Sequence, residues 1–204
     1  MILIGRLVSP GVRRVAVVCE LLGLSCEVKE VSAITQQDEV RRYNPLGRVP
    51  ALVLDDGEVL IESGAVIDHL LDLRPDAGRG LLPATGVERR RVLKATALAT
   101  GATEKYVAAV YERNRKAEGR TDPAWVEFCL GQAHAGLRAL EDWPPDPWLV
   151  GDRMTLADVT VAASFPLFGA MIPEFAPAGR YPRLEALCAR CEETEAFRRT
   201  APAS

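Results

Sequence analysis

The sequence predicts an α/β part at the amino terminus, followed by a part made only of helices. Residues 2–31 have the pattern strand, helix, strand, which implies a right-handed crossover and a parallel pair of strands. Residues 47–73 have the pattern of two short strands around a turn, followed by a helix. From residue 87 onward the apolar patterns are helical. The predicted order is β-α-β-α-β-β-α and then a helical bundle.

The first strand–helix–strand unit has recognisable limits. Residues 2–7 are apolar and β-prone, and residues 26–31 alternate as a second strand does. Between them, apolar residues recur at helical spacing over 12–22. Ser9 before Pro10 fits an N-cap followed by proline at the first helical position. We therefore expect the first helix to begin directly after Ser9.

A short helix and a hairpin are expected next. The helix is predicted near residues 38–42. Residues 51–54 and 58–61 have the pattern of two short strands. Residues 55–57, Asp-Asp-Gly, can form the tight turn between them, because Asp and Gly tolerate positive φ angles. Helical spacing follows, and Ser63 is the expected N-cap of that helix.

The segment after this helix predicts a domain boundary. Residues 74–86 hold two prolines and three glycines. The sequence therefore predicts a first domain at 1–76, a linker at 77–86 and a second, all-helical domain at 87–204. In the second domain, Thr155 and Asp158 have the spacing of a capping box. The helices expected there cover residues 87–116, the stretch from Asp122 to about Trp143, the stretch from Thr155 toward Gly169, and the stretch from Tyr181 to about Thr194.

Composition excludes several classes of partner. The 204 residues are 48% hydrophobic and 26% charged, as in ordinary globular proteins. A net charge of −3 gives no sign of a nucleic-acid partner or of an anionic membrane surface. No signal peptide is visible, and the longest apolar run, 159–172, is too short to span a bilayer. We expect a cytoplasmic protein.

The cysteine pattern offers a redox or metal interpretation and a simpler one. Cys188 and Cys191 form a C-x-x-C, but they share one predicted helix face with apolar residues. Small apolar residues of a core have the same pattern. A zinc site would need further Cys or His ligands, and the sequence has only His69 and His134. We expect core cysteines, no metal site, and a half-buried His134.

Two motifs resemble a known family. Residues 44–50, Asn-Pro-Leu-Gly-Arg-Val-Pro, precede the hairpin, and Glu62-Ser63 opens the next helix. This combination resembles the glutathione-binding half of the cytosolic glutathione transferases. Residues 151–158, Gly-Asp-Arg-Met-Thr-Leu-Ala-Asp, are similar to the start of the buried helix in their carboxy-terminal domain. The resemblance covers nearly the whole chain, and it implies a thioredoxin-like first domain and a helical-bundle second domain.

The resemblance also implies a reaction, in which the thiolate of glutathione attacks an electrophile. Ser9 would donate its hydroxyl to the sulfur at a helix amino terminus, as in the serine-dependent tau-type and bacterial classes. No tyrosine or cysteine stands in this turn, and the serine–serine–cysteine motif of the zeta-type isomerases is absent. The alternative is that Ser9 is only an N-cap.

Further residues follow from the resemblance. Val49 would pair its backbone with glutathione, aimed by a cis bond to Pro50, and Arg48 would meet the glycyl carboxylate. Glu62 and Ser63 would hold the γ-glutamyl end. Glu104 would be an acid that reaches the glutathione of the partner subunit. The side chains expected to line an acceptor pocket are Tyr106, Tyr111 and Arg113.

Three functions remain open on these residues. The first is a homodimeric glutathione S-transferase that conjugates glutathione to small electrophiles in detoxification. The second is a non-catalytic binding module on the same fold, since fold does not dictate function. The third is a glutathione-dependent peroxidase, isomerase or dehalogenase. An intact glutathione site favours an enzyme.

Overall fold

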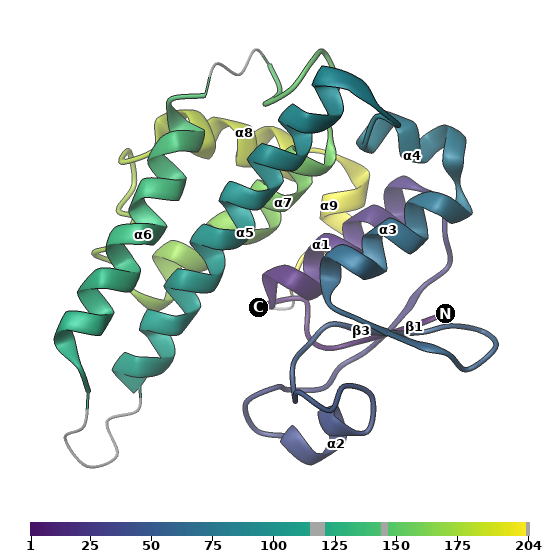
Figure 1. Ribbon diagram of the computed structural model, residues 1–204, viewed down its shortest axis with the longest axis horizontal. Coiled ribbons are helices and arrows are strands. Elements are labelled where there is room, and N and C mark those ends of the chain that lie inside the picture. The colour runs from purple at the N-terminus through teal and green to yellow at the C-terminus, as the bar shows by residue number, and fades with distance from the viewer. Residues whose placement is uncertain (115–120, 144–146, 203–204) are drawn as a thin grey trace. The chain divides into compact units, whose positions relative to one another are not determined.

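A computed structural model describes residues 1–114, 121–143 and 147–202, and the chain forms two compact units (Figure 1). The first unit contains Met1–Ala84 together with Cys191–Ser204, and the second contains Thr85–Arg190. Both ends of the chain therefore belong to the same unit.

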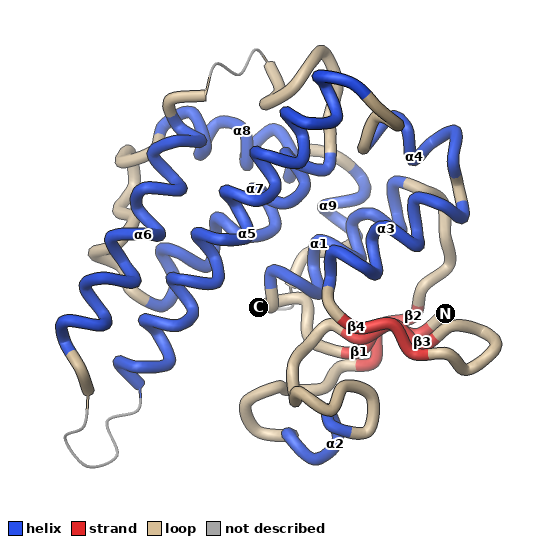
Figure 2. The backbone as a smooth tube through the Cα atoms, viewed as in Figure 1, coloured by secondary structure: helices blue, strands red, loops and turns tan. Residues whose placement is uncertain are grey.

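Four short strands form the mixed sheet of the first unit, in the order β2-β1-β3-β4 (Figure 2). β1 pairs in parallel with β2 and antiparallel with β3, and β3 pairs antiparallel with β4. The predicted crossover and hairpin are confirmed. The first two strands are shorter than predicted, and β1 ends before Gly5, whose φ of 134° lies outside the range of extended strands. The strands are β1 Ile2–Ile4, β2 Glu27–Lys29, β3 Ala51–Val53 and β4 Val59–Ile61.

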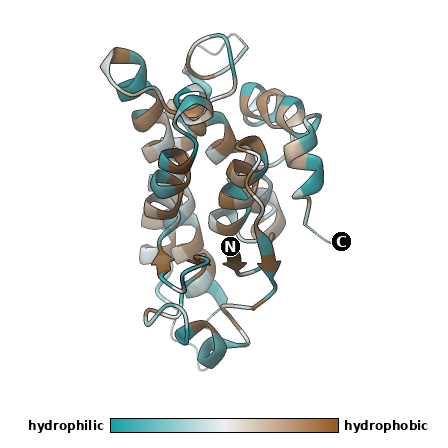
Figure 3. Cartoon of the chain, turned by 90° about the vertical axis from the view of Figure 1, so that its right-hand side faces the viewer, coloured by the Kyte–Doolittle hydropathy of each residue, from teal (hydrophilic) through white to brown (hydrophobic). Residues whose placement is uncertain are grey.

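Helices cover both faces of this sheet. α1 Pro10–Leu21 and α3 Ser63–Leu73 pack against each other on one face, and α2 Gln37–Arg41 lies on the other (Figures 1 and 2). Side chains alternate along a strand, so neighbouring residues serve opposite faces. Ile4 and Ala51 pack with Val40 of α2, whereas Leu3 and Leu52 are fully buried toward the other side. β1, β3 and β4 consist of hydrophobic residues (Figure 3), whereas β2 holds one valine between two charged residues. This is the thioredoxin-like arrangement that the sequence predicted.

The carboxy-terminal residues close the first unit. α9 Glu195–Arg199 packs on α1. Arg13 of α1 is 4% exposed, donates to Glu192 Oε2 over 2.7 Å and to the Thr200 carbonyl over 3.3 Å, and lies 5.2 Å from the ring centre of Phe197. Residues 191–204, which were predicted to belong with the second domain, are therefore grouped with the first unit.

The segment predicted as a linker contains a helix, α4 Pro75–Leu81. Pro75 occupies its first turn, where a missing amide hydrogen does no harm. Gly78 permits close packing, because a Cβ at this position would lie 2.7 Å from the Leu71 carbonyl oxygen. Glycine and proline, which suggested a linker, here begin a helix and bring it against α3.

The second unit consists of α5 Gly86–Asn114, α6 Pro123–Glu141, α7 Leu156–Met171 and most of α8 Pro182–Glu192 (Figures 1 and 2). α5 packs against both α6 and α7. The predicted helices are confirmed within a few residues, although residues 115 and 116 of the first lie outside the described residues. In the part of the chain that the structure describes, no helix combines the length and the apolar character needed to cross a membrane.

The predicted capping box at the start of α7 is present and buried. Asp158 Oδ2 accepts hydrogen bonds from the amide and the hydroxyl of Thr155, each 2.7 Å long, and Oδ1 accepts one of 2.9 Å from the Leu149 amide. Burial raises the pKa of Asp158, while these hydrogen bonds act in the opposite direction. The carboxyl group thus joins the start of α7 to the loop before it.

Candidate functional site

Two helix amino termini and one loop meet at a single point of the first unit. A Cβ placed on Gly11, in the first turn of α1, would lie 3.0 Å from Pro50 Cδ. The same point is 3.7 Å from Ser63 Oγ, in the first turn of α3, and 3.7 Å from the Val49 carbonyl oxygen. The peptide bond between Val49 and Pro50 is cis, as predicted. The structure therefore brings Val49, Pro50 and Ser63 together beside the turn that follows Ser9.

Glu62, and not Ser63, is the N-cap of α3. The prediction was wrong by one residue, because the Glu62 carboxylate reaches forward and accepts a 2.8 Å hydrogen bond from the Gly64 amide. Ser63 is already helical, and its hydroxyl donates to Glu62 Oε1 over 3.1 Å. The Ser63 side chain therefore belongs to the first turn of the helix, and it is bonded to the capping carboxylate.

Glu62 has an unusual backbone conformation. Its φ is 70°, and among the described residues it alone has a positive φ without being glycine. Such a conformation costs about 1–3 kcal/mol and is found mainly where the surrounding structure requires it, often at functional sites. Here the side chain caps α3 while the backbone turns sharply out of β4.

Ser9 lies at the amino end of α1, as predicted. Its backbone is extended, with φ −78° and ψ 123°, and its carbonyl accepts a 2.9 Å hydrogen bond from the Arg13 amide. The half-buried side chain makes no capping hydrogen bond to the helix. Its hydroxyl is therefore not engaged by the first-turn amides, although its backbone is that of an N-cap.

A hydrogen-bonded loop positions Val49. The buried Asn44 donates from Nδ2 to the Arg48 carbonyl over 2.8 Å and accepts at Oδ1 from the Leu46 amide over 3.0 Å. Gln37 of α2 donates to the Gly47 carbonyl over 3.1 Å. These bonds fix the backbone of 44–48 and hence the direction in which the chain enters Val49. The Arg48 side chain is exposed.

Two of these positioning residues had no predicted role. Asn44 was recognised only as part of the family motif, although Asn before Pro is a typical start of a side chain-stabilised turn. Gln37 carries no local signal, because its partner lies ten residues away. Only the folded chain brings the two together.

Arg14 is a second charged group near the site. It is 5% exposed, and a Cβ placed on Gly64 would lie 3.7 Å from Arg14 Nη2 and 2.8 Å from Glu62 Oε2. A buried guanidinium group and a carboxylate therefore face the same position at the start of α3. A faint signal of this is visible in the sequence, since two consecutive arginines interrupt a mostly apolar helix. The arrangement can hold a zwitterion, with an anion at the helix amino termini and a cation at Glu62.

The remaining candidates lie in the second unit, and one of them is a core residue. Tyr106 is fully buried, its hydroxyl donates to the Phe168 carbonyl over 2.9 Å, and its ring centre is 5.0 Å from that of Phe168. Burial raises the pKa of Tyr106. It cannot line an open acceptor pocket, so that expectation was wrong. Glu104 is exposed on α5, and Tyr111 is 53% exposed.

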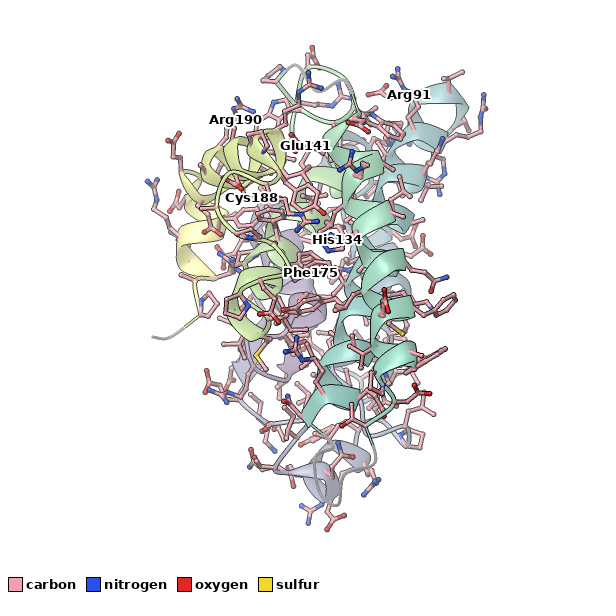
Figure 4. The ribbon with its side chains drawn as sticks, turned by 90° about the vertical axis from the view of Figure 1, so that its left-hand side faces the viewer. Arg91, His134, Glu141, Phe175, Cys188 and Arg190 are labelled. Carbon is pink, nitrogen blue, oxygen red and sulfur yellow. The ribbon has the colours of Figure 1, made fainter. Side chains whose placement is uncertain are left out.

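Arg113 pairs with Glu174 over 2.8 Å and lines a groove of about 640 Å³ within the second unit. His134, on the same groove, has its ring centre 3.9 Å from that of Phe175 (Figure 4). Its Nδ1 lies 2.7 Å from the Tyr181 hydroxyl. Burial, followed by the charges of two nearby arginines, lowers the pKa of His134, which is half-buried as predicted.

The cysteines of the C-x-x-C have the simpler of the two predicted roles. Cys188 and Cys191 are both buried in the core. In the described part of the chain, no three His, Cys, Asp or Glu side chains gather as a metal site would require.

Known proteins match both parts of the chain. Residues 3–78 match the family model of the glutathione S-transferase N-terminal domain, and residues 123–190 match that of the C-terminal domain. A maleylacetoacetate isomerase from Pseudomonas aeruginosa is 30% identical, over 94% of this chain and 91% of that protein.

Solved structures are similar over nearly the full length. A glutathione S-transferase from Methylobacillus flagellatus, crystallised with GSH bound, has a TM-score of 0.89 and 30% identity over 99% of each chain. One from Methylobacterium radiotolerans, in complex with glutathione sulfonate, has a TM-score of 0.91 and 26% identity over 100% of this chain and 95% of that one. The chain belongs to the glutathione S-transferase family.

Proposed function

We propose that this protein is a glutathione S-transferase that binds glutathione in its first unit and transfers the thiolate to small electrophiles. The observation that carries the proposal is the meeting of the α1 and α3 amino termini around Val49, Pro50 and Ser63. Similar proteins crystallised with GSH or glutathione sulfonate support the choice of ligand. Ser9, the hydroxyl-bearing N-cap residue of α1, favours a serine-type enzyme.

The γ-glutamyl end of glutathione is zwitterionic and suits the start of α3. Its carboxylate would accept hydrogen bonds from amides of the first turn and from the Ser63 hydroxyl, which would then turn from Glu62 Oε1 to the ligand. Its ammonium group would face the Glu62 carboxylate. The buried Arg14 guanidinium, on the same side, would favour the carboxylate over a neutral group at this end.

The rest of the tripeptide would lie along the loop before β3. The backbone of Val49 would pair with the cysteinyl residue as an added strand does. The exposed Arg48 would reach the glycyl carboxylate. These contacts bind glutathione without touching the sulfur, so they contribute affinity rather than reactivity.

The chemical step needs the thiolate, which is the nucleophilic form of the thiol. The Ser9 hydroxyl would donate a hydrogen bond to the sulfur, and the positive end of α1 would favour its negative charge. The thiolate then attacks an electrophilic carbon, a C–S bond forms, and the electron pair leaves with the departing group or takes a proton from solvent. Small electrophiles are the substrate class.

We further propose a cytoplasmic homodimer. Glu104, exposed on α5, would then be an acid that reaches the glutathione of the partner subunit. Light scattering at micromolar concentration should give about twice the chain mass, and a single-chain mass there would reject the dimer.

The direct test is isothermal titration with glutathione, followed by conjugation assays on a panel of electrophiles. The proposal expects binding at one site per chain and thiol consumption that depends on enzyme. Absence of binding would leave a non-catalytic module on the same fold. Ser9→Ala is the matched variant, because it should keep binding and reduce conjugation.

Isomerisation is a second candidate, favoured by the 30% identity to a maleylacetoacetate isomerase over most of both proteins. In that reaction glutathione would add to a cis double bond and leave again, so none would be consumed. Assays of a cis-enedione substrate that follow both the double bond and the thiol distinguish the two functions. Isomer conversion at constant thiol concentration would favour isomerisation over transfer.

A further inference from the structure

Two side-chain amides hold the loop that precedes the cis bond at Val49. Asn44 donates from Nδ2 to the Arg48 carbonyl over 2.8 Å, and Gln37 donates from Nε2 to the Gly47 carbonyl over 3.1 Å. A peptide unit is planar, so a carbonyl and the amide of the next residue turn together. Asn44 therefore fixes the plane that carries the Val49 amide. Gln37 fixes the plane before it, which carries the amide of Arg48.

The position of Gln37 in α2 places its side chain against this loop. Gln37 lies in the first turn of α2 and is half-buried, and a second hydrogen bond from its Nε2 goes to the Ala33 carbonyl. Gly47 is buried, and a Cβ placed on it would collide with Gln37 Oε1 and lie 3.6 Å from Gln37 Nε2. The amide group of Gln37 therefore lies directly against the Gly47 backbone, in space that only glycine leaves open.

The backbone of Gly47 needs to be held from outside the loop. Its φ is 66°, and glycine has a wider choice of backbone conformations than any other residue. The Gly47 amide donates to the Asn44 carbonyl over 2.8 Å, which fixes the peptide unit before Gly47. The bond from Gln37 fixes the peptide unit after it, and with that unit the direction in which Arg48 leaves the loop.

We propose that Gln37 determines specificity at the glycyl end of the ligand, so that the protein prefers glutathione to γ-glutamylcysteine, which lacks the glycyl residue. Gln37 acts as a positioning residue for Arg48, the side chain that would meet the glycyl carboxylate. The inference rests on the proposed function, because it needs glutathione to bind along this loop. The guanidinium group of an arginine recognises a carboxylate through a fixed geometry, so a backbone that turns freely beneath it reduces that recognition.

The first variant is Gln37→Met, which nearly keeps the length of the side chain and removes both of its hydrogen bonds. Its affinity for glutathione should fall about three- to tenfold, as expected for the loss of a hydrogen bond that holds the binding loop. Its affinity for γ-glutamylcysteine should change less than about twofold, because Asn44 still holds the Val49 amide. Titration calorimetry of the full chain with each ligand gives the ratio of the two affinities.

Gln36→Met is the matched control. Gln36 is the preceding residue, is exposed, and accepts a 2.9 Å hydrogen bond at Oε1 from the Ser32 amide, so its side chain serves the chain before α2. Its replacement should leave both affinities and their ratio unchanged. A general loss of structure in Gln37→Met would lower the two affinities alike. The ratio is therefore the measurement that a purely structural role of Gln37 would leave unchanged.

Arg48→Met tests whether Gln37 acts through Arg48. This variant should lose the preference for glutathione, and the double variant should lose no more, because two residues that serve one contact are not additive. An unchanged ratio in Gln37→Met would overturn the inference while glutathione still binds. Additive losses in the double variant would overturn it too, as would a wild type that binds both ligands equally. A wild type that bound neither ligand would reject the proposed function and the inference with it.

Discussion

Ser9 combines the backbone of an N-cap with a hydroxyl that makes no capping hydrogen bond. An N-cap side chain that bonds to the helix contributes about 1 kcal/mol, which Ser9 cannot supply through a bond that it does not make. Donation of the hydroxyl proton to a ligand is a separate role, because a capping hydroxyl accepts at its oxygen. The two hypotheses for Ser9 therefore predict opposite responses in stability and in chemistry.

Ser9→Ala should raise the pKa of the thiol of bound glutathione. One hydrogen bond to a charged group contributes roughly 1.5–3 kcal/mol, so the shift should be about one to two pKa units. Turnover at neutral pH should fall with it, while glutathione affinity and melting temperature change little. Ultraviolet titration of the thiolate in the complex measures the shift.

Asp122→Ala is the matched control for Ser9→Ala. The Asp122 carboxylate caps α6 by accepting from the amides of Ala124 and Trp125. Its loss should reduce the free energy of unfolding by about 1 kcal/mol and leave the thiolate titration unchanged. If Ser9→Ala behaves in the same way as this control, Ser9 is a cap and the sulfur is stabilised by other groups.

Two variants of Glu62 should separate its effect on folding stability from its effect on glutathione binding. Glu62→Ala loses the cap and keeps the positive φ, so it should unfold more easily and bind glutathione more weakly. Glu62→Gly loses the same carboxylate but accepts a φ of 70° without strain, and should be more stable than Glu62→Ala by about 1 kcal/mol. Thermal melts and titration calorimetry measure the two effects; equal melting temperatures for the two variants would contradict strain at this residue.

At the scale of elements, the start of α7 depends on one buried carboxylate. Asp158 accepts from two backbone amides and one hydroxyl, and each buried donor left without a partner costs about 1–3 kcal/mol. Asp158→Ala should therefore reduce the free energy of unfolding by about 2–5 kcal/mol, measured by urea denaturation. Asp152→Ala is the control, because the Asp152 side chain is 91% exposed and should change stability by less than about 0.5 kcal/mol. Similar midpoints for the two variants would show that the α7 cap contributes little.

At the scale of the whole molecule, both ends of the chain contribute to the first unit. The side chain of Arg13 in α1 donates hydrogen bonds to the Glu192 carboxylate and to the Thr200 carbonyl, both in the carboxy-terminal segment. Removal of a buried charged partner reduces the free energy of unfolding by more than removal of an exposed one. Arg13→Met should reduce the free energy of unfolding by about 2–4 kcal/mol, measured by urea denaturation.

Arg199→Met tests whether charge alone explains this effect. Arg199 pairs with Glu20 and Glu195, but its side chain is 62% exposed. Exposed pairs contribute about 0–1 kcal/mol, so this variant should lose at most that amount. If both variants lost the same free energy of unfolding, burial would not increase the contribution of the Arg13 contacts to stability.

The amino-acid sequence by itself determined the order of the elements apart from α4 and α9, the helix starts at Ser9 and Thr155, the cis bond before Pro50 and the family. These features depend on local chemistry, such as turn residues, capping side chains and apolar periodicity, which act over a few neighbouring positions. A motif such as residues 44–50 carries its own hydrogen bonds, so it can be recognised before the fold is known.

Only the tertiary structure decided the rest. Glu62, and not Ser63, caps α3 because the chain must turn out of β4 into that helix. Tyr106 is buried because one aromatic ring of α7 and one of the loop after it pack against its own ring. The carboxy-terminal residues join the first unit because Arg13 finds partners about 180 residues away, at Glu192 and Thr200. Each outcome depends on partners distant in the sequence, and packing between distant segments overrides local preference wherever burial is complete.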